Sequence, residues 1–61
     1  MTDAELRAML VDWAEEMGAS HEARKKWRQR RVPAEWKLRL MERAEIMGLR
    51  LRSQDLDRLL Q

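Results

Sequence analysis

The fold is decided by residues 18–33, GASHEARKKWRQRRVP. Six of the thirteen basic residues of the chain lie between Arg24 and Arg31, and a glycine and a proline bound the stretch. A glycine followed by a serine that can cap a helix, here Ser20, is typical of a tight turn leading into a helix. The sequence therefore predicts a short basic helix over 20–30, entered by one turn and left by another.

A longer amphipathic helix is predicted before this stretch, over residues 3–17. Its apolar residues recur at three- and four-residue steps, and Thr2 and Glu5 have the spacing of a capping box. Gly18 stands where a helix commonly ends with a positive φ angle. Because Ser20 follows so closely, the two helices are expected to form a helix-turn-helix.

Two further helices are predicted, over 33–47 and 53–60. Pro33 suits a first helical position, and Ser53 is placed to cap the last helix. Between them, residues 49–52 alternate apolar and basic side chains, as in a short extended connector. The chain is thus expected to be one all-α domain over 1–61, a small four-helix domain that contains a helix-turn-helix and has no internal repeat.

The apolar residues outline a small core. Trp13 lies on the apolar stripe of the first helix, and Trp27 and Trp36 are expected to pin two helices together. For the latter two, stacking on unpaired bases is the functional alternative. Leu38 and Ile46 lie off the main stripe of their helix, so we expect them to cover another segment or a partner chain.

The last predicted helix carries a patch of leucines, Leu56, Leu59 and Leu60. These side chains either fold back on the monomer or form a dimer contact, and the sequence favours neither. A chain of this length buries only about 60% of its unfolded surface. It has no cysteine and one histidine, which excludes disulfides and an ordinary zinc site. No metal or cofactor is expected, and a homodimer becomes the expected source of added stability.

Charge is unevenly distributed along the chain. Residues 1–19 carry a net charge of −4, residues 20–31 a net charge of +5 and residues 32–61 a net charge of +1. This distribution indicates a directed contact with a polyanion, although a merely solvated charged helix is the simpler alternative. No run approaches the roughly 18 apolar residues of a membrane span, and no signal peptide is recognisable, so a cytoplasmic protein without membrane contact is expected.

A helical projection divides the basic helix into two faces. Ala23 and Trp27 point inward. The opposite face carries donors, acceptors and long cations, which is what the reading of base edges requires. Arg30 and Arg31 would turn back toward the core if the helix continued, so the helix is expected to stop near Gln29 or Arg30 and leave both arginines free to reach phosphates.

The spacing of these residues resembles a known family. The pattern Ala14-x3-Gly18-x-Ser20-x2-Ala23-x3-Trp27 is similar to the helix-turn-helix of small Cro-like and YdaS-like regulators of bacteria and phages. The exit KWRQRRVPAEW, residues 26–36, and the tail over 49–56 also resemble those proteins. The chain departs from their pattern at Arg24, where a β-branched apolar residue is common, and at Arg31, where glycine is common. The stem of Arg24 could cover apolar surface while its guanidinium reaches solvent.

The resemblance implies sequence-specific binding of duplex DNA, with the second helix in the major groove and a dimer on a two-fold site. Residue by residue, it places base-reading or groove-facing side chains at Ser20, His21, Glu22, Lys25, Lys26 and Gln29. Long cations on or near this helix are candidates for contacts with DNA phosphates: Arg24, Arg28, Arg30, Arg31 and Lys37.

The sequence therefore predicts a DNA-binding transcriptional regulator, a repressor of the phage or mobile-element type. It would act in the cytoplasm, on the nucleoid if bacterial or in the host if phage-encoded. The alternative is a protein-interaction module, antitoxin-like or anti-activator, motivated by the acidic first helix and the C-terminal leucines. A third hypothesis is a protein that binds RNA or single-stranded nucleic acid through its tryptophans. No catalytic set is recognisable, so an enzyme is not expected.

Overall fold

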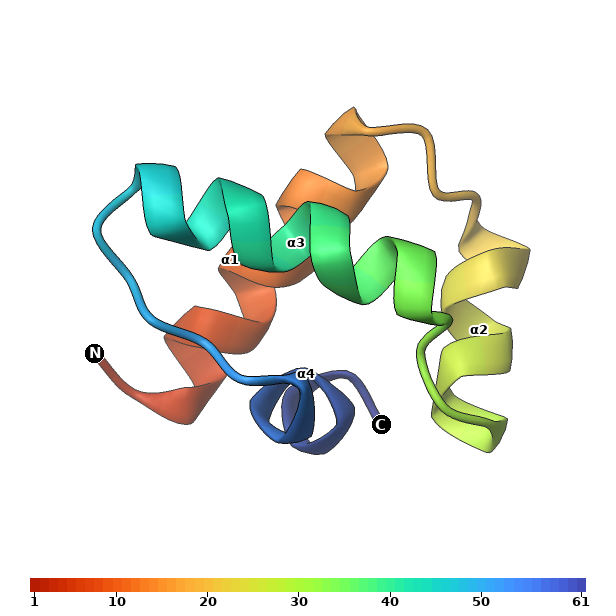
Figure 1. Ribbon diagram of the computed structural model, residues 1–61. Coiled ribbons are helices and arrows are strands. Elements are labelled where there is room, and N and C mark those ends of the chain that lie inside the picture. Colours follow the sequence, from red (N-terminus) through yellow and green to blue (C-terminus); the bar gives the residue numbers. More distant parts are fainter.

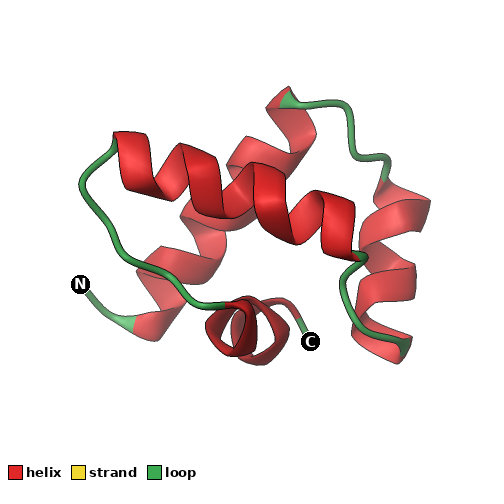
Figure 2. Ribbon diagram, viewed as in Figure 1, coloured by secondary structure: helices red, strands yellow, loops and turns green.

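The structure is a computed structural model that describes all 61 residues, and it contains four α-helices and no strand. α1 spans Asp3–Glu16, α2 spans His21–Gln29, α3 spans Ala34–Ile46 and α4 spans Ser53–Leu60. The predicted all-α, four-helix fold is confirmed (Figures 1 and 2). α1, α3 and α4 pack together, whereas α2 stands at one end of the molecule, beside the start of α3 (Figure 1).

Side chains cap the first two helices as predicted. The hydroxyl of Thr2 accepts a hydrogen bond from the Glu5 amide at 3.2 Å, and that of Ser20 accepts from the Ala23 amide at 3.1 Å. Each cap satisfies an amide that has no partner within its helix. α2 therefore begins at His21, one residue after its capping serine.

The caps of α3 and α4 differ from those predicted. Pro33, expected as the first helical residue, has an extended ψ of 146° and precedes the helix. Ser53, expected as a cap, is instead the first residue of α4. The Asp55 carboxylate accepts from the Arg52 amide at 2.9 Å, because Arg52 is the last extended residue and a carboxylate three positions later reaches back to it.

Two glycine turns have the same geometry. Gly18 and Gly48 have φ angles of 98° and 83°, the left-handed region that favours glycine. In the first turn the Ala19 amide donates to the Ala14 carbonyl at 2.8 Å, and in the second Leu49 donates to Ala44 at 2.8 Å. Both helices thus end in the same hydrogen-bonded motif, with the residue after the glycine satisfying a free carbonyl.

The matched turns belong to an internal repeat, so the expectation of no repeat is wrong. Residues 4–18 and 34–48 align without a gap at a spacing of thirty residues. Leu10 and Ala14 of α1 correspond to Leu40 and Ala44 of α3, and all four are fully buried. Seven aligned pairs are identical: Ala4 and Ala34, Glu5 and Glu35, Leu10 and Leu40, Ala14 and Ala44, Glu15 and Glu45, Met17 and Met47, Gly18 and Gly48.

The core is apolar throughout and includes the C-terminal leucines. Leu56, Leu59 and Leu60 are 0%, 4% and 5% exposed, and α4 packs against each of the other helices. Of the two alternatives for this patch, folding back on the monomer is the one observed. The other alternative, a dimer contact through these leucines, is not supported, because their surface is already buried within one chain.

Two large apolar side chains on α3 remain uncovered. Leu38 and Ile46 are 59% and 81% exposed, so no segment of this chain packs on them. They lie on the side of α3 opposite the buried Leu40 and Ala44, in agreement with their place off the apolar stripe. Nowhere in the fold is there a helix with the length and apolar character needed to cross a bilayer.

Replacement of leucine by alanine tests the burial of α4. We expect Leu56→Ala to lower the free energy of unfolding by about 3 kcal/mol, because a fully buried leucine leaves a cavity in a small core. Leu38→Ala, the same change at an exposed site, should alter it by less than about 0.5 kcal/mol. Urea unfolding followed by circular dichroism measures both; similar effects would contradict the packing described.

Candidate nucleic-acid interface

α2 is attached to the rest of the molecule through one face. Trp27 is its single fully buried side chain, at 3% exposure, and Ala23 is half-buried beside it. The last turn of α4 supports this attachment, since Leu60 and Trp27 line the same hollow. The inward pair predicted from the sequence is thus confirmed, and the remaining surface of α2 is directed outward.

The outward face carries the predicted base-reading residues. The structure exposes all six of them: Ser20, His21, Glu22, Lys25, Lys26 and Gln29. They bring ammonium, imidazole, carboxylate and amide groups onto one side of a nine-residue helix. Such a surface can donate to and accept from the edges of bases. Their roles toward DNA stay predictions.

One flank of this face is a shallow basic hollow. Side chains from three successive turns of α2 line it, and none of the four is apolar: His21, Arg24, Lys25 and Arg28. Lys25 and Arg28, which form no ion pair, give this hollow a local positive potential that attracts anions. The hollow lies on the side of α2 that faces α1, because Arg24 there forms an ion pair with Glu15 of α1.

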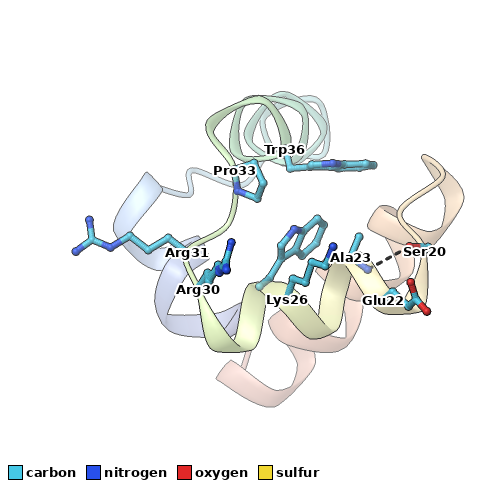
Figure 3. Close-up of a pocket in the computed structure, with 9 residues that line it drawn as sticks. Ser20, Glu22, Ala23, Lys26, Arg30, Arg31, Pro33 and Trp36 are labelled. Carbon is cyan, nitrogen blue, oxygen red and sulfur yellow. Dashed lines mark hydrogen bonds between the residues drawn. The ribbon is translucent and has the colours of Figure 1, made fainter.

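The other flank is an open groove between α2 and the start of α3 (Figure 3). The rings of Trp27 and Trp36 meet in it at a centroid distance of 5.5 Å and an angle of 54°. Lys26, Arg30 and Arg31 stand at its margin. The complete lining is Ser20, Glu22, Ala23, Lys26, Trp27, Arg30, Arg31, Pro33 and Trp36.

Two of the predicted phosphate contacts are occupied within the protein. Arg24, 21% exposed, pairs with Glu15 at 2.8 Å, and Lys37, 14% exposed, pairs with Asp57 at 2.8 Å. Both ion pairs join α-helices of the same chain, so these cations hold the scaffold together. We therefore remove them from the set expected to reach phosphates.

Arg24 also answers the question raised by its departure from the family pattern. Its stem is largely buried, as predicted, but its guanidinium turns to α1 and Glu15. The Nε atom is buried without a hydrogen-bond partner. A guanidinium held in this way costs part of its solvation, and the ion pair offsets that cost.

The remaining cations of this region are free. Lys25, Lys26, Arg28, Arg30 and Arg31 are exposed, and none of them forms an ion pair. By contrast, the cations that do form ion pairs all serve helix contacts or the surface of the scaffold: Arg24, Lys37, Arg39, Arg43 and Arg58.

The exit from α2 agrees with the prediction. The helix ends at Gln29, and Arg30 has extended angles of −126° and −174°. No residue other than glycine has a positive φ, so Arg31 meets the turn without backbone strain. Both arginines therefore lie outside the helix with their side chains exposed.

The groove is the feature that the sequence did not predict. Trp36 was expected in the core, but it is only partly buried, and the guanidinium of Arg39 lies over its ring at 5.2 Å. The sequence did contain a signal for the groove. Pro33 lies between Trp27 and Trp36, so the chain turns between two tryptophans that can then meet. No three His, Asp or Glu side chains lie close enough to hold a metal ion.

Comparison of the chain with known protein families, characterised proteins and solved structures finds no match. The resemblance to Cro-like and YdaS-like regulators therefore stays a prediction, and the function must be argued from the site.

Substitution of Arg24 tests whether it positions α2 or contacts DNA. We expect Arg24→Met to leave the free energy of unfolding within about 1 kcal/mol of the wild-type value, because an apolar side chain replaces a partly desolvated ion pair. Glu15→Gln should destabilise the protein more, since it leaves the half-buried guanidinium without its partner. Thermal unfolding measures the stability of both variants. A Glu15→Gln variant that is more stable than Arg24→Met would refute the role of Arg24 in positioning α2.

Proposed function

We propose that the protein is a transcriptional regulator that binds duplex DNA and inserts α2 into the major groove. One observation carries the proposal: five exposed cations without an acidic partner lie within residues 25–31, on α2 and its exit, whereas the only other unpaired cations, Arg7, Arg50 and Arg52, are spread over the rest of the chain. Five like charges within seven residues repel one another and produce a strong local positive potential, which an external polyanion would neutralise.

The shape of the site favours a duplex. The major groove of B-DNA admits one α-helix, and α2 stands at an end of the molecule with its polar face free. Its two flanks are both basic, one with Arg28 and the other with Arg30 and Arg31. A helix in the groove has a phosphate strand on each side, and the two flanks match that arrangement.

Individual roles follow from side-chain chemistry. Lys25 donates to guanine, Gln29 pairs with adenine, and Glu22 accepts from cytosine. Arg28, Arg30 and Arg31 contact phosphates and fix the position of the helix without reading sequence.

Repression from a two-fold operator is the form of regulation that we propose, with the protein acting as a homodimer in the cytoplasm. The dimer does not use the leucines of α4, which are buried within one chain. The resemblance to Cro-like and YdaS-like regulators is the basis for proposing a phage or mobile element as its source.

A protein-interaction module is the second candidate, and the exposed Leu38 and Ile46 favour it. A partner protein could cover these side chains. A stoichiometric complex that forms through Leu38 and excludes DNA binding would select this candidate over the first.

Salt dependence tests the free cations. We expect affinity for duplex DNA to fall steeply with salt, with a log–log slope of about −4.5 for each protomer if each of the five free cations neutralises one phosphate. Arg31→Ala should weaken all sequences alike and reduce the magnitude of the slope by about 1. Arg50→Ala, a change of equal charge at an exposed site away from α2, is the control and should leave the slope unchanged.

Selection of bound duplexes from a random DNA pool tests base reading. Wild-type protein should enrich a two-fold consensus, and Lys25→Ala should relax it at one position in each half-site, at a cost of about 1–3 kcal/mol for the preferred base. Fluorescence anisotropy on the selected duplex measures that cost. A pool that stays random at moderate salt would refute the regulator.

A further inference from the structure

The groove between α2 and the start of α3 has a composition that duplex binding does not explain. Its apolar side is built from Ala23, Trp27, Pro33 and Trp36, and three cations stand at its margin (Figure 3). Contacts with DNA phosphates would need only the cations, because a phosphate group has no apolar surface to place against the tryptophans. The aromatic surface beside them calls for a ligand that is flat and apolar at one end and anionic at the other.

Trp36 is the accessible ring of the pair. Trp27 is 3% exposed, whereas Trp36 is only partly buried and lines the groove; the guanidinium of Arg39, which lies over the Trp36 ring, is not part of the groove lining. The centroid distance of 5.5 Å is itself an aromatic contact, so no third ring fits between the two tryptophans. A planar ligand would therefore stack on Trp36 alone, where the ring borders the groove.

The margin supplies the anion contacts. Lys26, Arg30 and Arg31 have no ion-pair partner, and Figure 3 shows Lys26 and Arg30 directed along the groove while Arg31 points away from it. One carboxylate, that of Glu22, also lines the groove and can accept from an exocyclic amino group or an imide N–H of a base. Ring, cations and acceptor together fit a nucleotide, with its base on Trp36 and its phosphate on Lys26 and Arg30.

We propose that this groove binds an unpaired DNA nucleotide next to the duplex held by α2, so that the protein prefers a junction between duplex and single strand. The inference rests on the proposed function. Lys26, Glu22 and Ser20 belong both to the outward face of α2 and to the groove, so the two surfaces are continuous. A nucleotide tethered to the bound duplex also enters at high effective concentration, an advantage that a free nucleotide lacks in an open groove.

The experiment compares a blunt duplex with the same duplex extended by a short thymidine overhang, at either strand end. We expect the overhang to lower the Kd about fivefold or more, since one stacked base contributes that much. Trp36→Leu should abolish the difference and leave the affinity for the blunt duplex unchanged. Trp36→Phe should keep most of it, because phenylalanine still stacks, and should reduce the quenching of tryptophan fluorescence by the overhang.

A second groove variant and a control variant complete the comparison. Arg30→Gln changes an exposed side chain that the fold does not need; it should weaken both duplexes, and the extended duplex more, so that the ratio between overhang and blunt affinities falls. Arg50→Gln removes an equal charge away from the groove and should leave the ratio unchanged. Circular dichroism of each variant confirms that the helices persist.

The outcomes separate this inference from the proposed function. Equal affinities for blunt and extended duplexes would overturn the inference alone, as would a Trp36→Leu variant that weakens both equally. If free thymidine monophosphate, at the same concentration as the extended duplex, removes the effect of the overhang, the claim that the nucleotide binds because it is tethered to the duplex is overturned. Binding of single-stranded thymidine through Trp36 without any duplex binding would support the groove and overturn the duplex regulator. Binding of neither would overturn both.

Discussion

The packing of three leucines holds this molecule together. Leu56 of α4 meets no solvent, and with Leu10 and Leu40 it is one of the largest fully buried side chains. α4 packs against all three other helices, so their positions depend on it. In a chain of 61 residues with no disulfide, this apolar burial is the main stabilising term. The presentation of α2 depends on the same core, because Trp27 rests beside Leu60.

Ion pairs divide the molecule into a scaffold and a free helix. Arg43 pairs with Glu16, Lys37 with Asp57 and Arg58 with Asp3, so these pairs connect helices to one another. Most are exposed and contribute little individually. The distribution of charge matters more, since residues 20–31 carry a net charge of +5 and the rest of the chain a net charge of −3. The low net charge of +2 therefore conceals a strongly polar molecule.

Local sequence signals predicted the helices well, because each depends on neighbouring residues. The glycine at 18, the serine cap at 20 and the apolar spacing of Trp27 were sufficient to place α2. Contacts between distant segments were harder. Whether Leu56 packs on its own chain or on another depends on the path of residues 49–52, which no local pattern specifies.

Side-chain partners were the least predictable part of the site. Arg24 and Lys37 are long cationic side chains, as Arg28 and Arg31 are, and only the fold brings Glu15 and Asp57 beside the first two. The groove has the same origin. It requires the start of α3 to return beside α2, and that return places Trp36 near Lys26 and Arg30 at the margin of the groove.

The repeated helix and turn are followed by two helices in different environments: α2 is largely exposed, whereas α4 is packed into the core. Two residues separate Gly18 from α2, whereas four separate Gly48 from α4. The two additional residues are extended and add about 7 Å of reach. The shorter link keeps a polar helix at the end of the molecule, and the longer one brings a leucine-rich helix under α1 and α3. The same helix and glycine turn, followed by links of different length, thus precede both the helix that carries the basic surface and the helix that completes the core.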